Sequence, residues 1–267
     1  MSNTILAMGP AGSGKSTFAV SGEGITAYME FDPGSFARAA KGTNIDMSRV
    51  VLTKHYPPLT ALLDLGRVSV SNAGGIAPAT VHVLQGWRET YESFVQAYLN
   101  ALDDKDVQNI VIDTETRMWL TIRQSFLQQV QEAKGGEGDR LSQLQYTEPN
   151  ARHDQILVAA KMYDKNLVMV SHLKEEYRGD KATGRMIHDG YKEAPNEADL
   201  TLEFAIEDKL PIAWIRKGTL PLLDMKLEQP TIPYVVDLLD AAAAIQRAGL
   251  EMPTTPDEVI ALAKVLA

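Results

Sequence analysis

The sequence predicts an α/β domain in which a mainly parallel sheet is flanked by helices and followed by a C-terminal helical tail. Three observations predict it. An apolar run at residues 5–8 leads into a glycine-rich turn, a continuous apolar run ends in Asp113, and strand-like and helix-like segments alternate over 267 residues. A continuous apolar run is typical of a strand buried on both faces of a parallel sheet. We expect residues 1–230 to form the core and residues 231–267 a helical segment that packs on it or extends it.

The glycine-rich turn fits the P-loop pattern at every fixed position. It consists of Gly9, Pro10, Ala11, Gly12, Ser13, Gly14, Lys15 and Ser16, with Thr17 next. Glycine lets the backbone turn so that successive N–H groups face phosphate oxygens. Lys15 is expected to reach the β- and γ-phosphates, and the Ser16 hydroxyl to bind Mg²⁺. The motif therefore predicts ATP and Mg²⁺ as cofactors, although no base-reading motif separates ATP from GTP.

The composition excludes several other classes of protein. There is no cysteine, so disulfides, thiolate catalysis and zinc–thiolate sites are excluded. No apolar run approaches the length of a membrane span and no signal peptide is present, so we expect a cytoplasmic protein with no membrane partner. The net charge of −9 argues against a broadly basic surface but leaves room for a nucleic-acid site confined to one loop.

In the first half of the chain, local sequence patterns predict the remaining elements. After the P-loop we expect a helix to about residue 20, where Ser21-Gly22-Glu23-Gly24 ends it. β-Branched or apolar runs predict strands at residues 25–31, 50–53 and 109–114, and a hairpin at residues 67–84. Apolar residues at helical spacing predict a helix at residues 87–102.

The second half continues the alternation. Helices are expected at residues 118–130 and 152–163, separated by a polar loop at residues 133–150. Strands are expected at residues 166–170, 199–206 and 211–216, whereas residues 173–195 show no periodicity and are expected to form a mobile loop. A helix at residues 232–248 should be capped by Gly249, and Thr255-Pro256-Asp257-Glu258 is a capping box that opens a last helix.

Acidic residues at two strand ends supply the expected metal and water chemistry. Asp113 stands where a carboxylate holds Mg²⁺ in P-loop enzymes. Thr114 follows it, so the carboxylate that activates water must come from elsewhere, and Glu30 and Asp32 at the end of residues 25–31 are the candidates. We favour Asp32 over Glu30 and leave both open. Glu115 is expected to face the site, solvent or a helix N-terminus, and His153 and His188 to be structural or surface residues.

This order of motifs resembles the RecA-like ATPases, in which the catalytic glutamate ends the strand after the P-loop helix. The resemblance implies that His172, after Ser171, contacts the γ-phosphate, although Gln is commoner there. It also implies that Arg216 and Lys217 act as basic finger residues toward a neighbouring subunit. Asp32 is one methylene shorter than the family's glutamate, which puts the rate of hydrolysis in doubt.

The closest resemblance is to small phage-encoded RecA-like ATPases that act in single-strand DNA recombination and annealing. Residues 171–177 and 190–199 carry it, and it covers about residues 4–230. It implies a homo-oligomer, as ring or filament, in the host cytoplasm, acting on single-stranded DNA and working with other recombination or single-strand-binding proteins. The DNA-binding residues expected from the loop at residues 173–195 are Lys174, Tyr177, Arg178, Lys181, Arg185 and Tyr191. The alternatives are a helicase-like or packaging ATPase that translocates along DNA, and a nucleotide-gated binding module with little hydrolysis.

Overall fold

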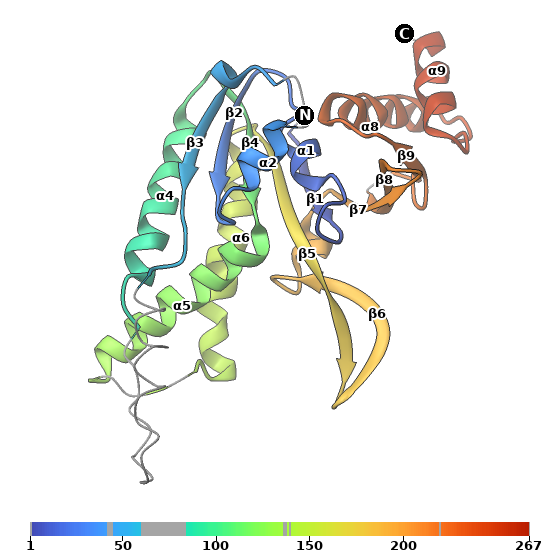
Figure 1. Cartoon of the computed structure of the whole chain (residues 1–267). Coiled ribbons are helices and arrows are strands. Elements are labelled where there is room, and N and C mark those ends of the chain that lie inside the picture. Colours follow the sequence, from blue (N-terminus) through green and yellow to red (C-terminus); the bar gives the residue numbers. More distant parts are fainter. Residues whose placement is uncertain are drawn as a thin grey trace.

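The structure, a computed structural model, describes residues 2–41, 45–59, 84–135, 138, 140–218 and 220–266. One mixed, nine-stranded sheet forms its centre, with strand order β3-β2-β4-β5-β1-β7-β8-β9 and β6 paired to β5 (Figure 1). The strands are β1 Thr4–Met8, β2 Ile25–Glu30, β3 Val50–Lys54, β4 Val107–Asp113, β5 Asn166–Arg178, β6 Lys181–Asp189, β7 Leu200–Glu207, β8 Leu210–Gly218 and β9 Lys226–Glu228. The helices are α1 Lys15–Ala19, α2 Ser35–Lys41, α4 Trp87–Asp103, α5 Glu115–Ala133, α6 Thr147–Met162, α7 Ala194–Glu197, α8 Ile232–Arg247 and α9 Pro256–Leu266, with short 3₁₀ turns at Met47–Arg49 and Gln143–Tyr146.

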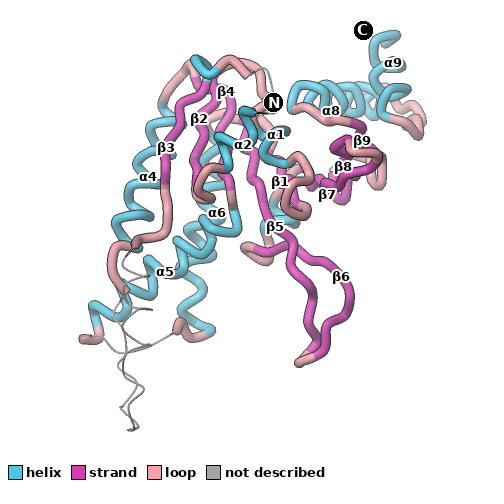
Figure 2. Tube along the Cα trace, viewed as in Figure 1, coloured by secondary structure: helices cyan, strands magenta, loops and turns pink. Residues whose placement is uncertain are grey.

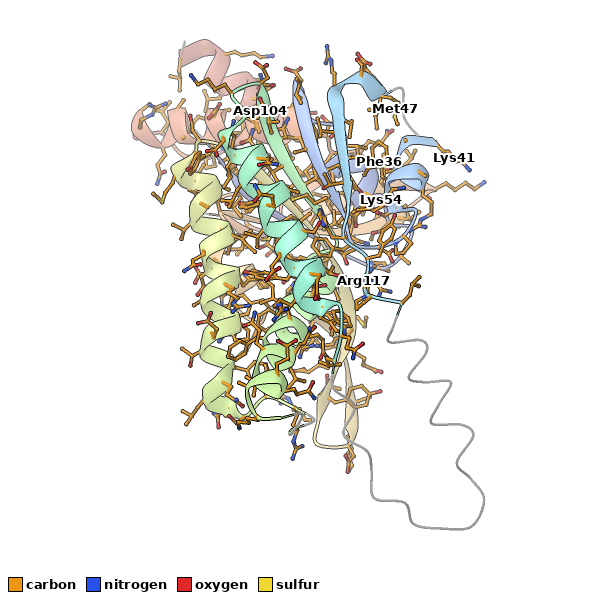
Figure 3. The ribbon with its side chains drawn as sticks, turned by 90° about the vertical axis from the view of Figure 1, so that its left-hand side faces the viewer. Phe36, Lys41, Met47, Lys54, Asp104 and Arg117 are labelled. Carbon is orange, nitrogen blue, oxygen red and sulfur yellow. The ribbon has the colours of Figure 1, made fainter. Side chains whose placement is uncertain are left out.

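The predicted fold class is confirmed. Strands β1, β2, β3, β4, β5 and β7 pair in parallel, and β8 and β9 continue the sheet antiparallel. Alternate strand residues point to opposite faces, so Ile110 and Ile112 of β4 pack on one face while Val111 packs on the other. Helices α4, α5 and α6 cover the first face, as Figure 3 shows, and α1, α2 and α8 contribute to the core of the second.

The parallel register brings the ends of β1, β2 and β4, and the point at Ser171 where β5 leaves the sheet, to one edge. Glu30 pairs with Asp113, Asp113 with Val170, and Met8 with Ser171. Because parallel strands end on the same side, the residues that follow Met8, Glu30, Asp113 and Ser171 all lie at this carboxyl edge. Open α/β sheets bind their ligands at such an edge.

Several predicted boundaries hold and others are wrong. Helix α9 begins with the expected capping box, in which the Glu258 amide donates to Thr255 Oγ1 (3.4 Å) and the Thr255 amide donates to Glu258 Oε2 (3.3 Å). Helix α5 begins three residues earlier than expected, because the Thr114 side chain caps it by accepting from the Arg117 amide. Helix α6 begins at Thr147 inside the expected polar loop. The hairpin expected at residues 67–84 lies, except for its last residue, outside the described residues.

The largest correction concerns residues 173–195, which do not form a mobile loop. Strand β5 continues beyond the sheet to Arg178 and pairs antiparallel with β6, giving a two-stranded ribbon that projects from the carboxyl edge (Figure 2). Most side chains of the ribbon are exposed on both of its faces, so the sequence lacks the alternation that marks a half-buried strand. Backbone pairing, rather than apolar burial, defines these strands.

His55, a buried histidine directly after β3, gives the stability of the fold a testable pH dependence. His55 is 3% exposed, its Nε2 lies 2.9 Å from Thr53 Oγ1, and its ring packs against Phe31 and Phe94. Burial lowers the pKa of His55 to about 4. The unfolded chain, with an ordinary histidine pKa near 6.5, therefore binds more protons than the folded chain between about pH 4 and 6.5.

We expect this histidine to cost about 3 kcal/mol of stability as the pH falls from 6.5 to 4. His55→Phe keeps a ring between Phe31 and Phe94 and removes the titrating group. The melting temperature of this variant should therefore fall less than that of wild type between about pH 6.5 and 4. Thermal unfolding at half-unit pH intervals measures the slope, which is independent of any constant loss from the substitution. Parallel slopes for the two chains would contradict the assignment.

Candidate nucleotide site

The P-loop leaves β1 and passes into α1 at the carboxyl edge of the sheet. Gly9 approaches β7 so closely that a Cβ there would lie 2.6 Å from the Phe204 carbonyl oxygen. Gly14 has a φ of +96°, and a Cβ there would lie 2.7 Å from the Pro211 side chain. The loop can therefore follow this path against β7 and β8 only with glycine at both positions.

Lys15 lies folded across the P-loop. Its Nζ donates to the carbonyl oxygens of Gly9 (2.8 Å) and Pro10 (2.6 Å), and Ser13 Oγ is 3.4 Å away. Burial lowers the pKa of Lys15 to about 8, and the nearby charge of Asp113 opposes that shift. A bound triphosphate would offer the ammonium charged oxygens in place of neutral carbonyls, which is a stronger interaction.

Asp113, at the end of β4, has the surroundings of a metal ligand. It is 1% exposed; one oxygen accepts from the Tyr28 hydroxyl, and Oδ1 is buried with no hydrogen-bond partner among the described residues. Burial raises the pKa of Asp113, while hydrogen bonds from Tyr28 and Ser16 oppose the shift. An unpartnered carboxylate oxygen beside a hydroxyl suits Mg²⁺, which is held through one or two protein oxygens plus phosphates. Within the described part of the chain, no cluster of three or more acidic, histidine or cysteine residues offers a different metal site.

Both candidate general bases already have partners. Glu30 is 2% exposed and accepts from the Phe36 amide (3.0 Å), from the Tyr56 hydroxyl and, at 3.5 Å, from Ser35 Oγ. Asp32 is more accessible and forms ion pairs with Arg38 (3.2 Å) and Arg117 (3.4 Å). Glu30 thus anchors the start of α2, whereas Asp32 can exchange its partners at the surface. The choice between them stays a prediction.

Ser171 and His172, where β5 leaves the sheet, lie between β1 and β4, as the sensor interpretation requires. The His172 amide donates to Thr116 Oγ1 (3.1 Å), and the Ser171 and Thr116 hydroxyl oxygens are 3.1 Å apart. The His172 side chain lines a cavity of about 440 Å³ between α5 and the base of the ribbon, together with Arg117, Arg123 and Lys174. Contact of His172 with a γ-phosphate stays a prediction.

The proposed finger residues are engaged within their own subunit. Arg216 Nε donates to Glu203 (2.6 Å), its NH1 donates to Asp224 (2.9 Å), and its guanidinium lies over the Trp214 ring. Hydrogen bonds to Glu203 and Asp224 raise the pKa of Arg216. Lys217 donates to the carbonyl oxygens of Asn196 and Ala198.

The candidate DNA-binding side chains divide into exposed and buried ones. Tyr177 is 61% exposed at the ribbon tip. Lys174 pairs with Asp189 (2.9 Å), and Arg178 lies 4.0 Å from Glu176. The expectation that Tyr191 contacts DNA is corrected by the structure. It is only 6% exposed, with ring centroids 4.4 Å from His153 and 5.1 Å from Trp119, so its ring is not free to stack on a base.

A groove runs from the P-loop strand to the ribbon. Its volume is about 860 Å³, and it is lined by one acidic residue, Glu203, and four cations: Lys174, Arg185, Lys192 and Arg216. Met8, directly before the P-loop, and Met186 on β6 contribute apolar surface. In a chain with a net charge of −9, the groove brings four cations close to the P-loop strand. Three of them pair with carboxylates: Lys174 with Asp189, Lys192 with Glu193, and Arg216 with Glu203 and Asp224.

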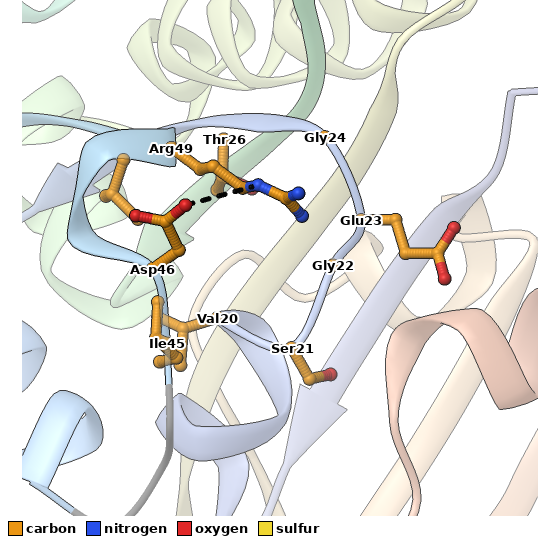
Figure 4. A pocket seen from close by; sticks show the side chains of 10 residues that line it. Val20, Ser21, Gly22, Glu23, Gly24, Thr26, Ile45, Asp46 and Arg49 are labelled. Atoms are coloured by element: carbon orange, nitrogen blue, oxygen red, sulfur yellow. Dashed lines mark ion pairs between the residues drawn. The ribbon is translucent and has the colours of Figure 1, made fainter.

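A second cavity lies at the other end of β2, away from the phosphates. It has a volume of about 420 Å³ and is bounded by residues 20–26 and 45–50, including the Asp46–Arg49 ion pair (Figure 4). Thr26, which lines this cavity, is the second residue of β2, whereas Glu30 ends β2 at the nucleotide site, so this cavity has no part in the site described above.

Sequence reasoning missed a buried cluster directly behind Asp113. The Glu115 carboxylate accepts from His153 Nε2 (3.1 Å) and His188 Nε2 (2.9 Å), although these residues are 38 and 73 positions away in sequence. Burial by itself would raise the pKa of Glu115, but the hydrogen bonds and charge of the two histidines outweigh it and lower the pKa to about 2. No local pattern could have revealed a pairing over such separations.

The fold and the site together define a P-loop protein whose mainly parallel sheet carries a candidate nucleotide site at its carboxyl edge. A family model described as an AAA domain matches residues 1–220, and the chain belongs to that family. No curated protein matches it. Among solved structures, the chain is similar to the RadB recombinase, with 13% sequence identity and a TM-score of 0.45 over 85% of this chain and 86% of that chain. No helix among the described residues is long and apolar enough to cross a membrane.

Proposed function

We propose that the protein is a Mg²⁺-dependent ATPase that acts on single-stranded DNA in recombination or annealing, in the manner of the phage-encoded proteins it resembles. One observation carries the proposal: the cationic groove begins at Met8, directly before the P-loop, and leads to the projecting ribbon. A polyanion in that groove would lie next to the bound nucleotide.

The residues of the site have separate tasks in this proposal. Lys15 and the P-loop amides neutralise the phosphates, while Ser16 and Asp113 hold Mg²⁺, which supplies further positive charge to the phosphate oxygens. Asp32 or Glu30 orients the attacking water. For Asp32 this requires release from Arg38 or Arg117, because a carboxylate held by two guanidinium groups is a weaker base.

Nucleic acid would bind through charge and stacking. Phosphate groups would contact Lys174, Arg185 and Lys192, which line the groove. The exposed Tyr177 ring offers a face to one base, a contact worth roughly 1–3 kcal/mol. Since these contacts read no base edge, we expect binding that depends weakly on sequence and strongly on salt.

Arg185→Ala/Lys192→Ala tests the groove. Neither residue belongs to the nucleotide site, so nucleotide affinity should stay near wild type while single-strand affinity falls. The slope of log affinity against log salt should flatten by about 1.4, or about 0.7 for each lost phosphate contact. Fluorescence anisotropy with a labelled oligonucleotide at several salt concentrations measures both quantities.

A matched control removes the same charge elsewhere. Arg247→Ala/Lys264→Ala lies on α8 and α9, outside the groove, and should leave the salt slope unchanged. An unchanged slope for the groove variant, or an equal change for the control, would place nucleic acid elsewhere or exclude it.

Self-assembly belongs to the same proposal. For Arg216 to reach a neighbour's γ-phosphate, its ion pairs with Glu203 and Asp224 must open, and Lys217 must leave the carbonyls that precede β7. Sedimentation with and without a non-hydrolysable ATP analogue measures whether nucleotide drives assembly, and electron micrographs separate ring from filament.

A second candidate function rests on the two engaged carboxylates. Because Glu30 anchors α2 and Asp32 is held by two arginines, a nucleotide-gated binding module with little hydrolysis is also consistent with the site. Phosphate release with and without single-stranded DNA separates the two functions: DNA-stimulated turnover supports the ATPase, and DNA binding without turnover supports the module.

A further inference from the structure

The Glu115 carboxylate joins three elements that meet behind the nucleotide site. Glu115 begins α5, His153 lies on α6, and His188 lies on β6 of the ribbon. The carboxylate also accepts from the Tyr191 amide (2.9 Å) just after the ribbon, and Ser171 Oγ is 3.4 Å away. Glu115 and His153 are fully buried, and the His188 side chain is 7% exposed, so water does not compete for these hydrogen bonds.

The backbone of the ribbon base is shaped around this carboxylate. A Cβ on Gly190 would lie 1.8 Å from Glu115 Oε2 and 2.6 Å from the His188 ring. Only glycine lets the chain approach closely enough for the Tyr191 amide to reach the carboxylate. The contact between α5 and the ribbon is therefore closely fitted.

The same turn of α5 contacts the nucleotide site. Glu115 follows Asp113, the proposed Mg²⁺ ligand, by two residues. Thr116 binds the His172 amide and Ser171, and Arg117 pairs with Asp32. Three consecutive residues thus connect the ribbon, the end of β5 and a candidate base to the strand that carries Asp113.

We propose that Glu115 is a positioning residue that, through His188, fixes the ribbon relative to Asp113, so that nucleotide binding at Asp113 alters the conformation of the ribbon. The inference rests on the proposed function, because it requires the site to bind a nucleotide. Coupling of this kind needs an element that connects the nucleotide site to the ribbon and whose conformation both can shift. The first turn of α5 is that element.

The chain offers a matched pair of variants. His188→Phe and His153→Phe each keep an aromatic ring and remove one N–H donor from the same buried carboxylate, but only His188 belongs to the ribbon. A purely structural role would make the two variants equivalent. His188→Gln keeps a donor and should behave as wild type.

The readout is cleavage by trypsin after Arg178 and Lys181, which flank the ribbon tip and are exposed. Affinity for a fluorescent ATP analogue with Mg²⁺ is measured in parallel. In wild type, saturating Mg²⁺ and a non-hydrolysable ATP analogue should change the cleavage rate at least about fivefold. In His188→Phe the change should fall below about twofold with nucleotide affinity retained, whereas His153→Phe and His188→Gln should keep it.

Each other outcome overturns the inference. If nucleotide changes the cleavage rate of His188→Phe as much as that of wild type, the cluster has only a structural role. The same holds if His153→Phe loses this change to the same extent as His188→Phe. If wild type binds nucleotide but its ribbon cleavage does not change, the inference fails while the proposed function stands; if wild type binds no nucleotide, both fail. Should His188→Phe not melt cooperatively, His188→Asn replaces it, because its amide lies where the imidazole has Nδ1 and falls short of the carboxylate.

Discussion

Lys15→Ala is expected to lower ATP hydrolysis by roughly 10²–10³-fold, the effect of removing one preorganised charge from a developing phosphoryl transition state. Lys15 is the cation that contacts the P-loop carbonyls, at 2.6–2.8 Å from Gly9 and Pro10, and the P-loop amides cannot replace its charge. Phosphate release under saturating Mg²⁺ and ATP measures the loss.

Two controls separate chemistry from folding. Lys264→Ala removes a lysine from α9 and should leave hydrolysis unchanged. Asp113→Asn keeps an oxygen that can accept from Tyr28, so its melting temperature should stay near wild type while hydrolysis requires much more Mg²⁺. Hydrolysis by Lys15→Ala close to wild type would remove the P-loop from the mechanism.

The P-loop turn and the strand that ends in Asp113 could be predicted because their determinants are local. The glycines, Lys15 and Ser16 lie within eight residues, and each is constrained by the path of the loop or by the chemistry of phosphate binding. Asp113 follows a continuous apolar strand, a pattern that is readable without its partners. Its Oδ1 is buried and has no hydrogen-bond partner among the residues that the structure describes, which sequence could not show because it depends on the packing of β2 against β4.

The rest of the site could not be predicted, for three physical reasons. The ribbon is held by backbone pairing, which leaves no side-chain period in the sequence. Helix α6 begins near Pro149, which is tolerated in a first turn where its missing N–H has no partner to lose. The partners of Glu115 come from α6 and β6, and only the tertiary fold brings them together.

Glu30 illustrates how tertiary contacts redefine a residue chosen for its chemistry. Its place at the end of β2 suggested a catalytic base. In the structure its carboxylate accepts from the Phe36 amide and so satisfies a donor at the start of α2, a helix that sequence reasoning did not identify. A carboxylate near the first amides of a helix stabilises it, so the same residue has a structural task as well.

Gly190→Ala is expected to destabilise the protein by about 3 kcal/mol, or roughly 6–12 °C in Tm. The added methyl group would lie 1.8 Å from Glu115 Oε2 and 2.6 Å from both Glu115 Cδ and the His188 ring. Neither can withdraw without breaking a buried charged hydrogen bond. Because Gly190 is not among the residues with positive φ, the effect isolates the clash from backbone strain.

Gly218→Ala is the matched control for this substitution. Gly218, at the end of β8, also lacks a positive φ, and a Cβ there would meet its nearest atoms at 3.6 Å, an ordinary contact. Its Tm should therefore stay close to wild type. Equal, small shifts in both variants would show that the ribbon base accommodates a side chain, and the close fit around Glu115 on which the coupling depends would then be lost. A large shift confined to Gly190→Ala means that the base of the ribbon and the start of α5 fit too closely to accommodate the added methyl group, as the coupling requires.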